Sequence, residues 1–253
     1  MTLSPQEQER YTRQIALPQI GEEGQLKLKK AKVAIIGLGG LGSPIAYYLA
    51  AAGVGSLVLI DPDVVGLPNL QRQILHTTDR VGELKVLSAK DRLEHLNPEC
   101  EILAVPSKLE TKNASALLDG CQLIVDACDN YATRFQISDI ACQLGIPHLY
   151  GSVWQFMGQV ALFDSKPGSP CYRCMFEENT SFQENDTASA AGILGAQPGL
   201  IGSIQALEAI KFLADISSPL QGAMLTVDSL KMRFTTIPLQ PNQHCDCTRV
   251  KND

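Results

Sequence analysis

The amino-acid sequence predicts an α/β fold. We expect a Rossmann-like, mostly parallel sheet extended by C-terminal antiparallel strands, with helices on both faces. Two observations predict it. Short apolar runs that suit buried strands alternate with segments of helical periodicity up to residue 144. A glycine-rich turn follows the first strand and opens the next helix, which is typical of nucleotide-binding α/β folds.

Local signals predict the elements in order. Ser4, followed by a proline and then by Glu7, is typical of a helix start. The predicted strands are residues 32–36, 57–60, 101–105, 123–127, 148–153, 159–163, 223–227 and 232–238. The later helices are predicted at residues 44–52, 85–96, 113–118, 133–144 and 199–214. Gly158 is expected to join the fifth and sixth strands, and residues 167–198 show no strong periodicity, as in a long functional loop.

Composition excludes several classes of protein. A formal net charge of -6 argues against nucleic acid as a partner, because phosphate backbones require a basic face. Residues 1–17 contain no apolar run long enough for a signal peptide, and the apolar segment 46–60 is too short to span a bilayer. We therefore expect a cytoplasmic protein that binds neither nucleic acid nor membrane.

The glycine-rich turn predicts a nucleotide site. Residues 37–42 match G-x-G-x-x-G between a strand and a helix, and Asp61 ends the next strand. Glycines let the backbone approach phosphates at a helix N-terminus, and the carboxylate can accept hydrogen bonds from ribose. The motif alone does not choose between NAD, FAD and ATP. The predicted contacts are Gly37, Gly39, Gly40, Gly42 and Asp61.

The segment after Asp61 favours ATP. Residues 69–73 and the later Lys85 place two cations and several amides close behind the ribose-binding acid. Nucleotidyl transfer must neutralise a triphosphate and a departing pyrophosphate, whereas hydride transfer has no such need. The predicted contacts here are Asn69, Arg72, Gln73 and Lys85.

A second carboxylate follows another strand. Asp129 lies just beyond residues 123–127, and ligands of such sheets bind outside the carboxyl ends of the strands. It could hold Mg²⁺ on phosphate oxygens, although Asp129 and Asn130 also suit a helix cap.

Taken together, these motifs resemble the MoeB/ThiF/HesA family, relatives of the ubiquitin-activating enzymes. The resemblance covers nearly the whole chain. The residues that carry it are 10–15, 37–42, Asp61, 69–73, Lys85, 126–130, 171–174 and 199–211. It implies ATP-dependent adenylylation of the C-terminal glycine carboxylate of a ubiquitin-like sulfur-carrier protein. A sulfur donor protein would then convert the adenylate to a thiocarboxylate, for thiamine or molybdenum cofactor biosynthesis.

The resemblance also implies residue roles. Gly40 would lie against the nucleotide, Asp61 would bind ribose and Asp129 would place Mg²⁺. Arg13 would enter the site of the other subunit in a homodimer. The phosphate contacts would be Asn69, Arg72 and Lys85. The carrier supplies the nucleophile, so catalysis requires positioning and charge neutralisation by Arg13, Arg72, Lys85 and Asp129.

The resemblance implies one adenylation domain over residues 1–253. N-terminal helices would occupy residues 1–30 and the nucleotide-binding core residues 31–165. A crossover loop would follow at 166–198, before a C-terminal helix, strands and a zinc-binding tail at 199–253.

Paired cysteines predict a zinc site. Of eight cysteines, four form two close pairs, which in a cytosolic chain favour a metal over disulfides. Cys171 and Cys174 match the first pair of the family. The second pair departs from it, because Cys245 and Cys247 are one residue closer, and His244 is an alternative fourth ligand.

The crossover loop also departs from many relatives. They carry a cysteine there that can bond covalently to the carrier, and Ala188 stands at about that position. The sequence leaves three other functions open: an NAD-dependent oxidoreductase, a related tRNA-modifying dehydratase, and a zinc-stapled module that binds the carrier without activating it.

Overall fold

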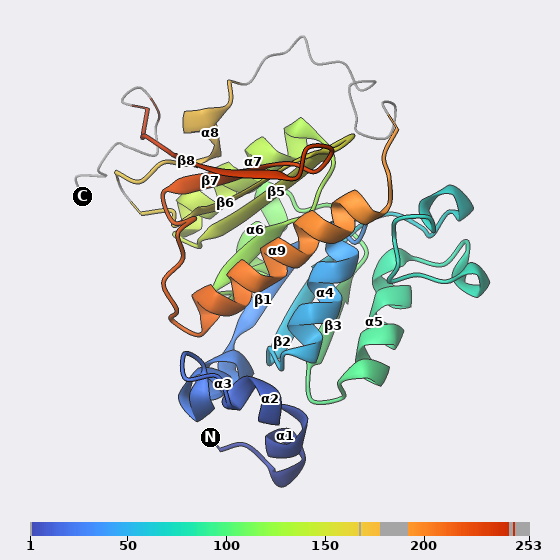
Figure 1. Cartoon of the computed structure of the whole chain (residues 1–253). Coiled ribbons are helices and arrows are strands. Elements are labelled where there is room, and N and C mark those ends of the chain that lie inside the picture. The colour runs from blue at the N-terminus through green and yellow to red at the C-terminus, as the bar shows by residue number, and fades with distance from the viewer. Residues whose placement is uncertain (1, 167, 178–191, 243–244, 246–253) are drawn as a thin grey trace.

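We describe the fold from a computed structural model, which describes residues 2–166, 168–177, 192–242 and 245. An eight-stranded sheet runs through these residues in the order β3-β2-β1-β4-β5-β6-β7-β8 (Figure 1). β1 to β5 pair in parallel and β6 to β8 antiparallel, which confirms the predicted fold class. The strands are β1 (Lys32–Ile36), β2 (Ser56–Ile60), β3 (Glu101–Val105), β4 (Leu123–Asp126), β5 (His148–Trp154), β6 (Met157–Phe163), β7 (Ala223–Asp228) and β8 (Arg233–Pro238).

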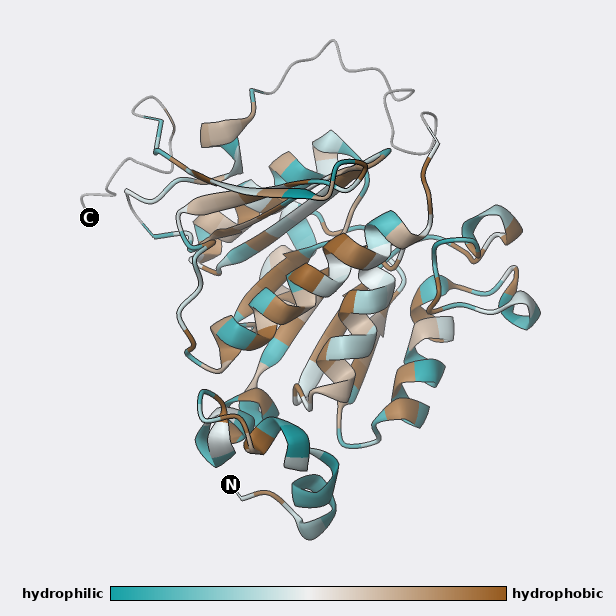
Figure 2. Ribbon diagram, viewed as in Figure 1, coloured by the Kyte–Doolittle hydropathy of each residue, from teal (hydrophilic) through white to brown (hydrophobic). Residues whose placement is uncertain are grey.

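Two apolar clusters cover the two faces of the sheet. Val33 and Ile35 of β1 belong to one cluster, Ala34 and Ile36 to the other, because alternate side chains of a strand point to opposite faces. The first cluster includes residues of α4 (Gly42–Ala51), α5 (Lys85–Leu96) and α9 (Ala196–Leu213). The second includes residues of α6 (Thr111–Leu117) and α7 (Tyr131–Leu144). Hydrophobic residues concentrate on the central strands and α9, whereas the N-terminal helices are largely hydrophilic (Figure 2).

The N-terminal helices lie beyond the amino ends of the parallel strands (Figure 1). They are α1 (Pro5–Arg10), α2 (Thr12–Ile15) and α3 (Gly21–Lys30). The predicted capping box of α1 is present: the amide of Glu7 donates to Ser4 Oγ at 3.2 Å, and the amide of Ser4 donates to Glu7 Oε2 at 2.6 Å. No helix of the described residues is long and apolar enough to cross a membrane.

Two predictions about the second half of the chain are wrong. Gly158 does not join two strands; it lies inside β6, opposite Val153, and Gln155 takes the positive φ of the turn. A Cβ on Gly158 would come within 2.2 Å of Ile201, so glycine is needed there for the approach of α9. No regular element was predicted within residues 167–198, but the described parts of this region contain α8 (Tyr172–Met175) and the first residues of α9, which begins at Ala196 and not at residue 199.

Candidate active site

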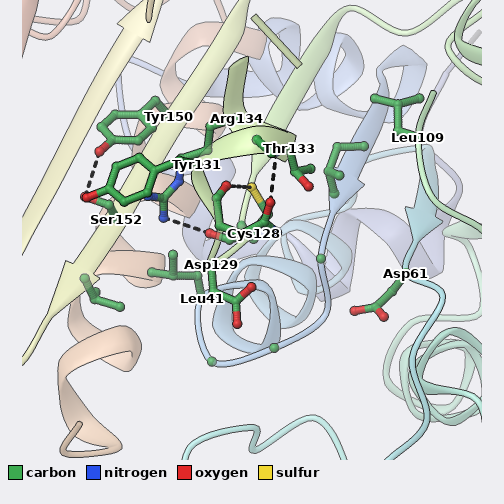
Figure 3. Close-up of a pocket in the computed structure, with 18 of the residues that line it drawn as sticks. Leu41, Asp61, Leu109, Cys128, Asp129, Tyr131, Thr133, Arg134, Tyr150 and Ser152 are labelled. Atoms are coloured by element: carbon green, nitrogen blue, oxygen red, sulfur yellow. Dashed lines mark hydrogen bonds between the residues drawn. The ribbon is translucent and has the colours of Figure 1, made fainter. Parts of the chain in front are cut away.

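A cavity of about 1160 Å³ opens at the carboxyl ends of β1, β2 and β4 (Figure 3). Ligands of open α/β sheets bind at this edge. The cavity is lined by eight of the residues predicted from sequence: Gly37, Gly39, Gly40, Asp61, Arg72, Gln73, Lys85 and Asp129. Residues scattered over almost a hundred positions are therefore collected by the strand ends.

The glycines of the turn between β1 and α4 serve two purposes. Gly37 has a φ of 95°, and a Cβ there would lie 2.8 Å from the carbonyl oxygen of Ala127. A Cβ on Gly42 would lie 2.1 Å from the carbonyl oxygen of Gly37. These two glycines let the turn form. Gly39 and Gly40 line the cavity; at Gly39 the nearest atom to a Cβ would be Gln73 Nε2 at 3.5 Å, so that position is free to meet a ligand.

Asp61 and Lys85 face the turn from one side. The Asp61 carboxylate is buried and accepts the amide of Leu38 at 2.7 Å and that of Asp63 at 2.8 Å. Lys85 begins α5, an unfavourable place for a cation, and is also buried. Its Nζ donates to Asp63 Oδ2 at 2.8 Å and lies 3.9 Å from Asp61 Oδ2. A buried cation that lines the cavity can pair with the phosphates of an anionic ligand.

The segment between β2 and α5 supplies an arginine and an amide. Arg72 lines the cavity, and its guanidinium donates to the carbonyl of Pro68 at 3.2 Å. Gln73 is buried, and its Oε1 has no hydrogen-bond partner among the described residues. Asn69, a predicted phosphate contact, is not among the residues that line the cavity, and its Oδ1 accepts from Arg72 Nη2 at 3.5 Å.

Asp129 stands alone at the cavity wall. It is exposed, it follows β4, and its carboxylate points toward the glycine turn (Figure 3). Within the part of the chain that the structure describes, no hydrogen bond or ion pair holds this carboxylate. Asn130, not Asp129, caps α7, since Asn130 Oδ1 accepts the amide of Thr133 at 2.9 Å. The alternative that Asp129 is a capping residue is therefore wrong.

Arg13 lies far from the cavity within one chain. It is an exposed residue of α2, at the opposite edge of the sheet, and does not line the cavity (Figure 1). Its role, which was predicted for the site of a second subunit, stays a prediction.

Sequence reasoning missed His76. Its Nε2 donates to the carbonyl of Leu38 at 3.1 Å, and Nδ1 lies 2.9 Å from Ser88 Oγ. Burial lowers the pKa of His76, so the ring is neutral and Nδ1 accepts from the serine. The amide of Leu38 donates to Asp61, and its carbonyl accepts from His76. Both backbone polar groups of Leu38 in the glycine turn are therefore hydrogen-bonded. No local pattern marks His76 as part of the site.

Residues 126–130 were noted from sequence, but the buried hydrogen bonds of Asp126 beneath Asp129 were not predicted. Asp126 accepts from His148 Nε2 at 3.2 Å and from the Cys128 thiol at 2.8 Å. Burial would raise the pKa of Asp126, but the hydrogen bond and charge of His148 and the charge of Arg134 oppose it and hold the pKa below its usual value. Arg134 lines the cavity and donates from Nη2 to the carbonyl of Cys128 at 2.9 Å.

Comparison with known proteins identifies the family. A model described as the ThiF family matches residues 11–249. The chain belongs to the ThiF family. It is 42% identical over 249 residues to a sulfur carrier protein adenylyltransferase of Thermus thermophilus, a match that covers 97% of this chain and 92% of that protein. It is 39% identical to a SAMP-activating enzyme E1 of Haloferax volcanii, over 97% of this chain and 90% of that one.

Longer relatives and solved structures match this ThiF-family chain as well. The adenylyltransferase and sulfurtransferase MOCS3 of Mus musculus is 42% identical, and the match covers 97% of this chain and 53% of MOCS3. A crystal structure of PaaA superposes with a TM-score of 0.81 at 26% identity, covering 95% of this chain and 76% of that one. Escherichia coli MccB in a crystal structure with ATP gives 0.80 at 22% identity over 97% and 75%, a likeness of fold.

The ThiF-family chain also brings cysteines together. Cys171 is the N-cap residue of α8 and Cys174 lies within this helix, and their sulfur atoms are 3.9 Å apart. Cys245 Sγ lies 3.6 Å from Cys171 Sγ, and the three sulfurs all lie within 4.8 Å of one another. Zinc–sulfur bonds of about 2.3 Å place tetrahedral thiolates roughly 3.8 Å apart, so the spacing suits a zinc ion. The predicted ligand Cys247, the residue His244 that was the alternative to Cys245, and Ala188 all lie outside the described residues.

Proposed function

We propose that this ThiF-family protein uses ATP to adenylylate the C-terminal glycine carboxylate of a small ubiquitin-like sulfur-carrier protein. The observation that carries the proposal is the cavity itself. A glycine turn, a buried lysine, an arginine and an isolated carboxylate meet where this fold binds ligands. The names of the full-length relatives support this reaction over an NAD-dependent one.

The site provides what adenylylation requires. The carrier carboxylate attacks the α-phosphorus of ATP, the bond to the bridging oxygen breaks, and pyrophosphate leaves. Negative charge on the phosphates grows toward the leaving group, and Lys85 and Arg72 can stabilise it. Lys85 would exchange its contact with the exposed Asp63 for the nucleotide, while Asp61 retains lone pairs for ribose hydroxyls.

Mg²⁺ would be held by Asp129. The fit rests on a carboxylate that is exposed to the cavity and has no hydrogen bond or ion pair to the rest of the described chain. Oxygen ligands of this kind bind Mg²⁺ together with substrate phosphates. When bound, the ion neutralises phosphate charge and orients the nucleotide.

Several finer features belong to the same proposal. Residues 1–253 form one adenylation domain, and two chains form a homodimer in which Arg13 reaches the other subunit's site. Zinc is held by Cys171, Cys174, Cys247 and either Cys245 or His244, and the place of Cys245 beside the first two sulfurs supports Cys245. The adenylate receives sulfur from a donor protein, for thiamine or molybdenum cofactor biosynthesis, in the cytoplasm.

The proposal is tested by measuring pyrophosphate release with ATP, Mg²⁺ and purified carriers of the thiamine and molybdenum cofactor types. We expect release that depends on one carrier and stops when its terminal glycine is deleted. Nicotinamide absorbance changes with NAD would not accompany it. Pyrophosphate release that ignores the carrier, or none with any carrier, would contradict the proposal.

A further inference from the structure

The position of Asp129 depends on the backbone that precedes it. Its carboxylate makes no hydrogen bond or ion pair to other described residues, so side-chain contacts do not fix it. A metal-binding carboxylate must nevertheless be held within a fraction of an ångström of its working position. The Asp129 side chain must therefore be positioned by its own backbone. That backbone is fixed by the peptide unit between Cys128 and Asp129 and by the helix cap at Asn130.

Two buried, oppositely charged side chains hold Cys128. Its amide donates to Asp126 Oδ1 at 3.1 Å, and its carbonyl accepts from Arg134 Nη2 at 2.9 Å. That carbonyl belongs to the peptide bond that leads into Asp129. Hydrogen bonds to charged groups are stronger than neutral ones, and burial strengthens them further. Figure 3 shows Arg134 on one side of Cys128 and the Asp129 carboxylate pointing away from it.

Arg134 is itself fixed in place. It is 6% exposed, and its guanidinium carbon lies 5.5 Å from the ring centre of Tyr150 and 5.8 Å from that of Tyr131. No carboxylate of the described residues forms an ion pair with it. Burying an arginine without an ion-pair partner costs folding free energy. We therefore look for a functional role of this side chain.

We propose that Arg134 is a positioning residue: by anchoring the Cys128 carbonyl, it holds Asp129 where Mg²⁺ and the phosphates of ATP bind. The inference rests on the proposed function. Arg134 acts through the backbone and not through substrate. Asp126 is its counterpart on the amide side of Cys128, supported in turn by His148.

The test compares Arg134→Met with wild type by the affinity of the ATP-bound protein for Mn²⁺, read from the electron paramagnetic resonance of free Mn²⁺. Loss of residues that orient a metal ligand typically weakens metal binding 10–100-fold, and we expect about tenfold. Arg92→Met is the matched control, because Arg92 donates two hydrogen bonds to Tyr47 outside the cavity. Unchanged Mn²⁺ affinity in a folded Arg134→Met protein would overturn the proposal.

A double-mutant cycle separates positioning from substrate contact. If Arg134 acts through Asp129, adding Arg134→Met to Asp129→Asn should lower pyrophosphate release less than about twofold further. Effects that multiply would mean a direct contact and contradict the proposal. Should Arg134→Met not fold, Arg134→Lys is measured in the same way, with an intermediate loss of Mn²⁺ affinity expected and none overturning the inference.

Hydrogen exchange provides a readout that needs no carrier. The amides of residues 128–130 should exchange faster in Arg134→Met than in wild type, while those of β1 stay protected. Equal exchange at residues 128–130 would contradict the anchoring role. If wild type binds Mn²⁺ and ATP but releases no pyrophosphate with any carrier, the proposed function fails, and these comparisons still decide the role of Arg134.

Discussion

The nucleotide cavity and the cysteine cluster are built in contrasting ways. The cavity sits on the ends of three parallel strands, and hydrogen bonds from side chains to the backbone hold its turns before any ligand arrives. The cluster joins a four-residue helix to Cys245, which lies 74 positions from Cys171. Strand ends give a preorganised site, whereas the cysteine cluster would, on the proposed function, be completed by a metal ion. Changes in the cavity should therefore alter the rate, and changes in the cluster should alter stability.

Asp129 offers the largest effect on the cavity side. We expect Asp129→Ala to lower carrier-dependent pyrophosphate release by about a hundredfold or more. The variant lacks the carboxylate proposed to hold Mg²⁺, which neutralises phosphate charge. The circular dichroism spectrum and melting temperature should stay unchanged, because the side chain makes no hydrogen bond or ion pair to other described residues. Asp119→Asn, an exposed change outside the cavity, is the control. A rate near that of wild type would remove Asp129 from the site.

Mixing two inactive variants tests whether the cavity is complete in one chain. Arg13→Ala and Lys85→Ala homodimers should each be inactive. After subunit exchange, hybrid dimers contain one site with both residues intact, so random mixing should restore about a quarter of the wild-type sites. The measurement is pyrophosphate release before and after exchange. Mixtures that stay inactive despite proven exchange would place Arg13 in a structural role.

Two glycines of one motif should separate rate from stability. Gly37→Ala forces a φ of 95° and a close contact with Ala127, so we expect a loss of about 2 kcal/mol or more in the free energy of unfolding. Gly39→Ala meets nothing closer than 3.5 Å and should keep its stability but bind ATP more weakly. Denaturant unfolding and ATP titration check both. Equal losses of stability would mean that Gly39 also shapes the turn.

The cysteine cluster should show the opposite response. Removing the metal with a chelator, or Cys174→Ser, should lower the melting temperature by about 5 °C or more, because structural zinc contributes directly to folding. Pyrophosphate release at moderate temperature should fall much less. Metal analysis should find one zinc per chain. If the rate fell as much as the stability, the two regions would not differ in the way we propose. If protein purified without chelator lacked zinc, the zinc site would be excluded.

His76 should give the smallest effect. Burial lowers its pKa, so below about pH 6.5 the unfolded chain binds a proton that the folded protein excludes. Stability should therefore fall as the pH drops from 6.5 toward the folded-state pKa, and His76→Gln should flatten this fall. Melting temperatures across this range provide the measurement. A variant with the same pH dependence as wild type would show that other groups control it.

The sequence predicted the parts of the fold and site that depend on local pattern. The α5 helix and β3 strand were predicted at their observed bounds, because hydrophobic period and flanking residues define them. Gly37 and Asp61 were predicted to lie at the site because the glycine motif and Asp61 each follow or end a predicted strand. Gly158 was wrongly predicted to join two strands. Glycine is needed there because Ile201 of α9, which is distant in the sequence, packs against it.

Buried polar partners were beyond prediction for the same reason. His76 and Arg134 each hold a backbone carbonyl at a strand-end turn, at Leu38 and Cys128, and neither belongs to a recognisable pattern. Only the folded chain shows that both turns are fixed in this way. Most residues that line the glycine-turn end of the cavity could be read from sequence, but those that hold its turns in place could not.

The central claim, that the cavity transfers AMP to a carrier carboxylate, is tested most directly by following label from ATP. The protein is incubated with Mg²⁺, a matching carrier, and ATP labelled at either the α- or the γ-phosphate. Label from the α-phosphate should move to the carrier C-terminus and label from the γ-phosphate to free pyrophosphate, both lost in Asp129→Ala. Transfer of γ-label to the carrier, or α-label that stays on free nucleotide while pyrophosphate is released, would contradict it.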